Sequence, residues 1–210
     1  MARNLVLGLA GILLLLAVFA VLVSQMVVRP ARAMVQGLAE IAKLDQQVLS
    51  TREYLAASDT LRSDDFYRVL RVHRQVKQGL GARFAGIEPR LRQLTQQSIG
   101  QLQLDYRKAL DLFRDQGRLL VEAKKIQVEA LNQQNLSVAQ YRALHKQIYS
   151  SLHLGVPELN AQELLRQVAR GEFNPVVSLP QSPVAAENRR LVEPFTQELL
   201  LYYPLTWFGL

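Results

Sequence analysis

The first feature of the chain is an unbroken apolar run near its N-terminus. Residues 5–28, LVLGLAGILLLLAVFAVLVSQMVV, contain no charged side chain. A helix of about 24 residues is roughly 36 Å long, enough to cross a hydrocarbon layer of about 30 Å. A secretory signal peptide has a shorter apolar core, and the Ala-x-Ala sequence at 31–33 lies beyond Pro30. We therefore expect an uncleaved transmembrane anchor at 5–28, preceded by a short N-terminal tail at 1–4.

After the anchor, apolar residues recur at seven-residue spacing. They are Met34, Ile41, Val48 and Leu55. Such a heptad pattern is typical of a helix that packs along a neighbouring helix. It predicts a helical stalk that continues from the anchor to about residue 57.

Three further amphipathic helices are predicted in the same region. The second helix is expected to begin with Ser63 as its N-cap, where acidic residues follow, and to end among glycines before a fresh start at Pro89. The third, at 88–134, is the longest, and the fourth follows Ser137. Short connections between amphipathic helices favour antiparallel neighbours. We therefore expect 29–153 to form an elongated, antiparallel, coiled-coil-like helical bundle.

The last part of the chain is divided by prolines. A short helical segment is predicted at 154–172, and three prolines in NPVVSLPQSPV favour an extended strap at 173–184. Helix formation resumes in 185–210, where Pro194 interrupts it and Pro204 is expected to end it. The predicted fold class is thus all-α, with one transmembrane helix, a helical bundle, a Pro-rich strap and an aromatic C-terminal tail.

The apolar tail contains four aromatic side chains of particular interest. They are Tyr202, Tyr203, Trp207 and Phe208. The tail is too short to span a bilayer, and such side chains occur at bilayer interfaces and in buried protein contacts. Three placements are open: the chain's own bundle, a partner subunit, or the membrane surface. We assign these residues to a partner or membrane contact.

The net charge of +7 is concentrated in residues 62–92, which hold eight cations and three anions. Arg68, Arg71 and Arg74 fall opposite the apolar stripe of their helix, so they are predicted to face outward. One interpretation is a solvated helix face, and the other is contact with an acidic partner or anionic lipid heads. Nucleic acid is disfavoured as a partner, because the sequence shows no module that reads bases.

The sequence provides little catalytic or metal-binding chemistry. It has no cysteine, which excludes disulfides and thiolate ligands, and it has three histidines and no recognisable catalytic or phosphate-binding motif. His73 and His145 lie on apolar stripes, where a hydrogen-bonded core histidine is the more common role than a ligand. We therefore expect no enzyme activity, no cofactor and no metal.

Together these patterns predict a non-enzymatic, single-pass membrane protein that acts as a scaffold, assembly or regulatory subunit of a membrane-associated complex. The alternative is a membrane-tethered ligand-binding or sensing bundle. The layout is similar in outline to the exported sensor bundles of bacterial receptors, which is an analogy of fold alone. The short tail at 1–4 fits an N-terminus that stays in the cytoplasm while the body is exported, so we expect the bacterial inner membrane with the body in the periplasm. A homodimer is also open, because heptad seams close equally well between chains.

Overall fold

The computed structural model describes residues 29–51, 60–99, 103–104, 106–157, 177–178 and 186–210, and these are mostly helical. In chain order the helices are α2 (Arg29–Asp45), α3 (Ser63–Leu80), α4 (Ala82–Ser98), α5 (Tyr106–Gln133), α6 (Val138–Ser150), α8 (Ala186–Val192), the 3-10 helix η2 (Glu193–Phe195) and α9 (Thr196–Thr206). Strands β1 (Gln103–Leu104) and β2 (Val177–Ser178) form one short antiparallel pair. The all-α fold class and the helical bundle are confirmed.

Several predicted parts lie outside the described residues. They are the anchor at 5–28 and most of 154–184, which holds the short helical segment and the strap. In the portions of the chain that are described, no helix is both long and apolar enough to cross a membrane. Of the strap, the structure describes β2 alone, and its two residues are extended as predicted.

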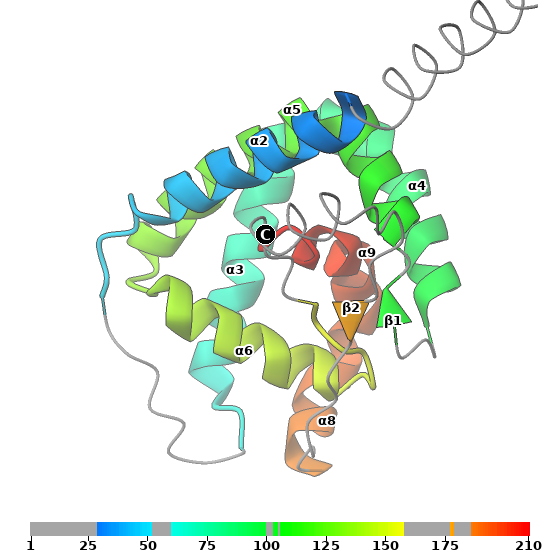
Figure 1. The fold of residues 1–210 in the computed structure, drawn as a ribbon. Coiled ribbons are helices and arrows are strands. Elements are labelled where there is room, and N and C mark those ends of the chain that lie inside the picture. The colour runs from blue at the N-terminus through cyan, green and yellow to red at the C-terminus, as the bar shows by residue number, and fades with distance from the viewer. Residues whose placement is uncertain (1–28, 52–59, 100–102, 105, 158–176, 179–185) are drawn as a thin grey trace, which may run out of the picture.

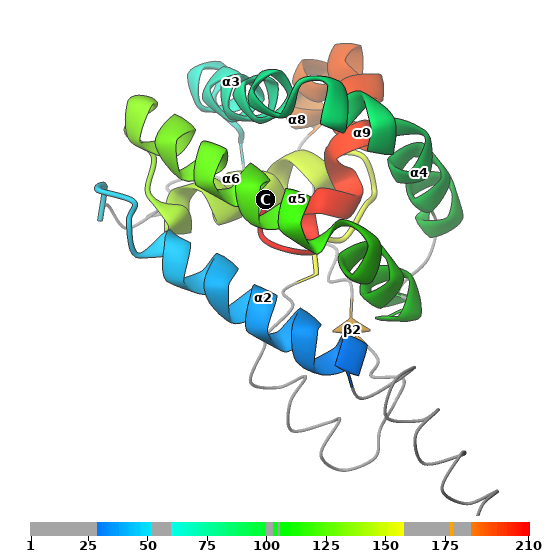
Figure 2. The same cartoon turned by 90° about the horizontal axis from the view of Figure 1, so that it is seen from above.

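Helix α5 lies between α2 and α3 (Figures 1 and 2). Asp45 at the end of α2 pairs with Lys124 of α5, and residues just after α2 reach Asn132 further along α5. The two helices therefore run parallel, and the expectation of antiparallel neighbours is wrong for this pair. They are not consecutive in the sequence, so no short connection dictates their direction.

Helix α2 ends at Asp45, so the prediction of a stalk to residue 57 is wrong. The next three backbone N–H groups bond to carbonyls three residues earlier, at 3.0–3.2 Å, which tightens the last turn. The Asn132 side chain then bonds to the backbone of two residues that follow α2. It donates to the carbonyl of Gln47 at 3.2 Å and accepts from the N–H of Leu49 at 2.7 Å. A heptad pattern identifies buried positions, but it does not mark where the helix stops.

Helices α3 and α4 meet at Gly81, so the predicted break among glycines is confirmed. Gly81 has a φ of 52°, which favours glycine, and its N–H bonds to carbonyls of the last turn of α3. The N-cap of α3 is Arg62 without a side-chain cap, so Ser63 is the first helical residue instead of the cap. Helix α4 runs through Pro89, so the predicted fresh start there is wrong. The carbonyl that loses its donor to Pro89 belongs to the exposed Ala85, so it is not left without a partner in a dry interior.

The single long helix predicted at 88–134 is two helices, α4 and α5. The Ser98 hydroxyl donates to the carbonyl of Leu94 at 2.8 Å, and Ile99 is extended with a ψ of 130°. A hydroxyl that bonds the preceding turn competes with the backbone and weakens helix continuation. Strand β1 occupies part of the gap before α5 begins at Tyr106.

Helix α9 is enclosed by α3, α4 and α6 (Figures 1 and 2). After its first turn, α9 and the residues that follow it are buried on all sides, at Leu199, Leu201, Tyr202, Tyr203, Leu205, Trp207, Phe208 and Leu210. A helix that is apolar all round is typical of the inside of a protein. The bundle is therefore wrapped around its C-terminal helix, and the prediction of an elongated, coiled-coil-like shape is wrong.

Pro204 lies inside α9, although the sequence predicted that it would end the helix. Proline has no N–H, so the carbonyl four residues earlier, at Leu200, loses its helical donor. The Thr95 hydroxyl of α4 donates to this carbonyl at 2.7 Å. A tertiary hydrogen bond thus replaces the missing helical one, which the local sequence could not reveal.

Replacing Thr95 by valine is expected to destabilise the protein by about 1–3 kcal/mol, because the partly buried Leu200 carbonyl loses its donor. In a Pro204→Ala background the loss is expected to be smaller, since alanine restores the backbone N–H. Urea unfolding of the wild type, both single variants and the double variant measures this coupling. An equal effect of Thr95→Val in both backgrounds would contradict the explanation.

Candidate functional site

Two histidines meet in the centre of the bundle. His73 of α3 and His145 of α6 are almost fully buried, and their Nε2 atoms are 2.8 Å apart. At this distance one Nε2–H donates to the other Nε2, so the rings carry opposite tautomers. The sequence prediction of hydrogen-bonded core histidines is confirmed, and each is the other's partner.

Aromatic rings cover this histidine pair. The Tyr202 ring stacks on His73, with centroids 4.3 Å apart and an interplanar angle of 6°, and Tyr141 lies 4.0 Å from His145. Further rings extend the cluster, namely Phe84, Tyr149, Tyr203 and Trp207. We call the two histidines and these six rings the aromatic cluster.

Burial keeps the histidines of the aromatic cluster neutral. It lowers the pKa of His73 to about 3. Burial also places the pKa of His145 well below its ordinary value, and the nearby His73 and Lys124 lower it further. At neutral pH the pair therefore carries no charge.

The tyrosine hydroxyls of the aromatic cluster bond mainly to the backbone. Tyr149 donates to the carbonyl of Leu199 at 3.0 Å and Tyr203 to that of Gly155 at 2.8 Å, while Tyr202 donates to the carbonyl of His73. Burial raises the pKa of each of these phenols, to about 12 for Tyr203, so all three are neutral. Their hydroxyls fix α9 in place, and their arrangement is that of a structural core.

A buried ion pair lies beside the aromatic cluster. The Nζ of Lys124 is 2.6 Å from Asp45 and donates to the carbonyl of Gly209 at 2.8 Å. Asp45 also pairs with the more exposed Arg142 at 2.8 Å. Burial lowers the pKa of Lys124, and Asp45 opposes this effect by favouring the charged form. This pair links α2, α5 and the C-terminal segment.

This ion pair was not predicted from the sequence, although one signal was present. Lys124 follows Leu120 by four residues on an otherwise apolar stripe of α5, where a charge is out of pattern. A charged residue in such a position requires a buried counter-ion. The identity of the counter-ion, Asp45, depends on the parallel packing of α2 and α5, which the sequence did not show.

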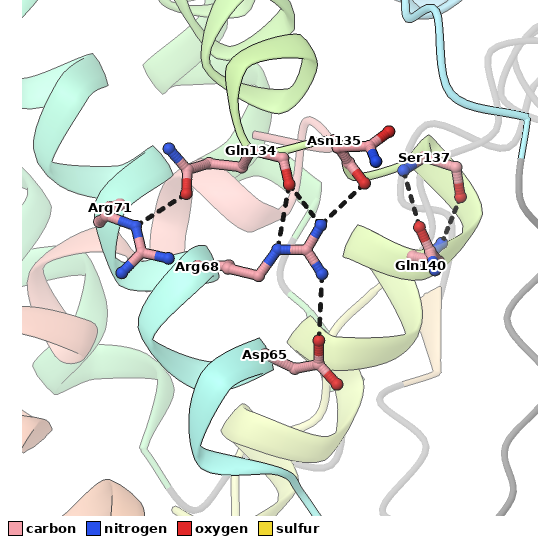
Figure 3. A network of polar contacts seen from close by, with 7 residues as sticks. All are labelled: Asp65, Arg68, Arg71, Gln134, Asn135, Ser137 and Gln140. Carbon is pink, nitrogen blue, oxygen red and sulfur yellow. Dashed lines mark hydrogen bonds and ion pairs between the residues drawn. The ribbon is translucent and has the colours of Figure 1, made fainter.

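The three predicted arginines share one face of α3, and each contacts its own chain. Arg68 spans three acceptors: the carbonyls of Gln134 and Asn135 and the carboxylate of Asp65 (Figure 3). Arg71 donates to the side chain of Gln134 at 2.7 Å (Figure 3). Arg74 makes two hydrogen bonds with Glu198 of α9, at 2.8 and 2.9 Å. Contact of this face with an acidic partner or lipid stays a prediction.

Arg68 stabilises the turn between α5 and α6. Asn135 has a φ of 51°, and the N–H of Leu136 bonds back to the carbonyl of Leu131, as in a Schellman motif. Ser137 then begins α6 with a capping box to Gln140 (Figure 3). Because the carbonyls after α5 lack helical donors, the guanidinium serves as their C-terminal cap.

Replacing Arg68 by alanine is expected to destabilise the protein by about 2 kcal/mol, because charge-assisted bonds to two backbone carbonyls are lost. Arg71→Ala is the matched control on the same helix, and an effect within about 0.5 kcal/mol is expected because Arg71 is exposed. Chemical denaturation measures both changes. Equal effects of the two variants would mean that Arg68 is a surface side chain like its neighbour.

The four predicted contact residues of the tail are buried in the chain's own core. Tyr202, Tyr203, Trp207 and Phe208 are each at most 3% exposed. This is the first of the three placements that the sequence left open. Contact of these side chains with a partner or a bilayer stays a prediction, and it requires α9 to leave its site in the bundle.

The structure also contains a large surface cleft and a small niche. A cleft of about 1150 Å³ opens between α2 and α5, with Arg83, Arg118 and Lys125 among its lining residues. A niche of about 40 Å³ lies beside Tyr141 and His145. Within the described parts of the chain, no three His, Asp or Glu side chains are grouped to hold a metal ion.

Comparisons with known proteins give no further assignment. No protein-family model, no curated protein and no solved structure matches the chain.

Proposed function

We propose that the protein is a non-enzymatic, single-pass membrane protein whose helical body acts as a scaffold, assembly or regulatory subunit of a larger complex. The observation that supports this proposal is the packing of α2, which follows the proposed anchor at 5–28 directly. Leu38, Ile41 and Leu44 of α2 are buried, and Asp45 binds the buried Lys124. Helix α2 is thus part of the body and is not a free linker.

A fixed connection between anchor and body suits a role in assembly. A flexible tether leaves a domain free to rotate, whereas a packed helix gives the body a defined orientation to the membrane. A defined orientation matters when partner subunits must meet the same surface repeatedly. We place the anchor in the bacterial inner membrane and the body in the periplasm, and a homodimer through the exposed helix faces is included in this proposal.

The exposed cations of α3 and α4 are the proposed partner surface. Arg74, Lys77 and Arg83 already pair with carboxylates of the chain itself. Among the described residues, Arg71 is exposed and bonds to a neutral glutamine side chain, as Arg90 of α4 does, so its charge is not paired with a carboxylate and is available to an acidic partner.

Affinity purification of the full chain from native membranes in mild detergent, followed by mass spectrometry, tests the proposal. A stoichiometric partner is expected with the wild type and with Arg118→Glu, an exposed residue of α5, and a weaker yield of it with Arg71→Glu. Recovery of the chain alone, correctly folded, would count against the scaffold function.

A membrane-tethered ligand-binding or sensing module is the second candidate. The cleft between α2 and α5 favours it, because a ligand there would contact both the anchor-linked helix and the body. If the chain purifies alone, thermal-shift screening of small molecules with the Lys125→Ala variant as a control tests this second function.

A further inference from the structure

The histidine pair lies where three helices meet. His73 belongs to α3 and His145 to α6, and Tyr202 of α9 both stacks on His73 and donates to its carbonyl. The junction of α3, α6 and α9 therefore depends on two groups that titrate near physiological pH when they are exposed to water.

The buried histidine pair has no favourable site for an additional proton. One ring donates its Nε2–H and the other accepts at Nε2. A further proton on the accepting Nε2 sets two N–H groups against each other at 2.8 Å. A further proton on a remaining Nδ1 creates an imidazolium in the core, and Nδ1 of His73 has no hydrogen-bond partner there.

The groups that face the pair do not compensate such a charge. They are Lys124 from α5, Tyr141 and Tyr149 from α6, and Tyr202 from α9. Lys124 is a cation and the phenols are neutral. Asp45 already pairs with Lys124 and Arg142, and Glu198 already pairs with Arg74. A protonated pair is therefore relieved only when water reaches it.

We propose that the His73–His145 pair is a pH-sensitive latch, and that its protonation opens the junction of α3, α6 and α9 and exposes the aromatic side chains of α9. The opened state makes Tyr202, Tyr203, Trp207 and Phe208 accessible for the contact that the sequence predicts. The latch is independent of the proposed function, because it needs neither an anchor nor a partner.

The direction and size of the effect follow from proton linkage. The folded state holds both histidines neutral, whereas an open state binds protons at the ordinary pKa of about 6.5, so acid favours the open state. Two such sites increase the ratio of open to closed molecules by up to about 10³-fold between pH 7 and pH 5. The ratio of open to closed molecules begins to rise as the pH falls below about 6.5. It stops rising only when the closed state itself takes up protons.

Trp207 provides a direct readout, because it is the only tryptophan of the chain and is 1% exposed. We would measure acrylamide quenching of its fluorescence in the full chain in nanodiscs from pH 7.5 to 4.5, with circular dichroism alongside. Quenching is expected to rise several-fold below pH 6.5 while most helicity is retained. Simultaneous loss of helicity and of Trp207 protection would mean global unfolding and would overturn the latch.

Three variants test whether the pair is responsible. His73→Phe combined with His145→Leu is expected to remove the transition or move it at least one pH unit lower. His145→Gln keeps a hydrogen-bonding side chain and leaves one titrating site. The number of protons taken up on opening, given by the steepness of the quenching curve against pH, should therefore fall from about two toward one. His153→Asn is the matched control, because His153 is exposed and has a φ of 57°, which asparagine tolerates.

The outcome for Glu198 completes the test. Glu198→Gln removes the ion pair between α3 and α9. The acid transition should persist in this variant. If Glu198→Gln abolishes it, or if the single His145→Gln variant shows the wild-type midpoint and slope, the histidine pair is not the latch.

Discussion

Replacing Trp207 by alanine is expected to destabilise the protein by about 3–5 kcal/mol. Trp207 is 1% exposed, and its ring packs edge-on against Tyr203 with centroids 6.0 Å apart. Removal of the indole leaves a cavity that rigid neighbouring helices cannot close. Since small domains are stable by about 5–15 kcal/mol, this single change removes a large share of the total.

The size of the loss can be checked against two variants. Trp207→Phe keeps an aromatic ring and should cost distinctly less than alanine. Leu49→Ala removes a large apolar side chain that is 82% exposed, and an effect within about 0.5 kcal/mol is expected. Urea unfolding followed by circular dichroism measures all three variants. Wild-type stability of Trp207→Ala would show that the tail is not part of the core.

Replacing Asp45 by alanine is expected to destabilise the protein by about 3–5 kcal/mol, because Lys124 is left buried without its counter-ion. The side chain of Lys124 is 2% exposed and that of Asp45 is 14% exposed, so water does not replace the lost carboxylate. The opposite change, Lys124→Met, should be milder, since Asp45 retains Arg142 as a partner.

The combined variant separates charge from packing. Asp45→Leu together with Lys124→Met removes both charges, and a stability near or above that of the wild type is expected. Arg142→Ala is the exposed control and should change stability by less than about 1 kcal/mol. If Asp45→Ala is as mild as Arg142→Ala, the ion pair is solvated and does not tie α2 to the body.

The local pattern predicted α3 and α6 well because their signals are local. Glycines end α3 at Gly81, and Ser137 begins α6. The stripe positions His73 and His145 were also correctly assigned to the core. The two helix ends are determined by contacts within a few residues along the chain, where capping rules apply, and the core positions of the histidines follow from the spacing of the apolar stripe.

The features that the sequence did not predict depend on contacts between distant residues. The end of α2 depends on Asn132, and the continuity of α9 through Pro204 depends on Thr95. The placement of Lys124 depends on Asp45 in a parallel helix. The members of each pair are far apart in the sequence. Their pairing depends on how the helices pack, and a local sequence pattern does not show that. The same holds for Arg68, which looked like an outward cation and caps the turn after α5.

The burial of the aromatic tail affects how its proposed role in docking can be tested. An aromatic, uncharged ending is compatible with a partner, a bilayer or a protein core. The structure encloses it, and therefore truncation of α9 is not a clean way to remove a docking element, because it removes the core as well. Surface variants such as Arg71→Glu are the appropriate probes of a partner.

The proposed function depends most on the rigid attachment of α2 to the body, and a distance measurement in lipid nanodiscs tests it directly. The chain has no cysteine, so Ala39→Cys on α2 and Gln97→Cys on α4, both exposed positions, accept spin labels selectively. Pulsed electron paramagnetic resonance should give one narrow distance distribution that does not change with the lipid used. A broad distribution would show that α2 is a flexible tether, and it would contradict a body held in fixed orientation to its anchor.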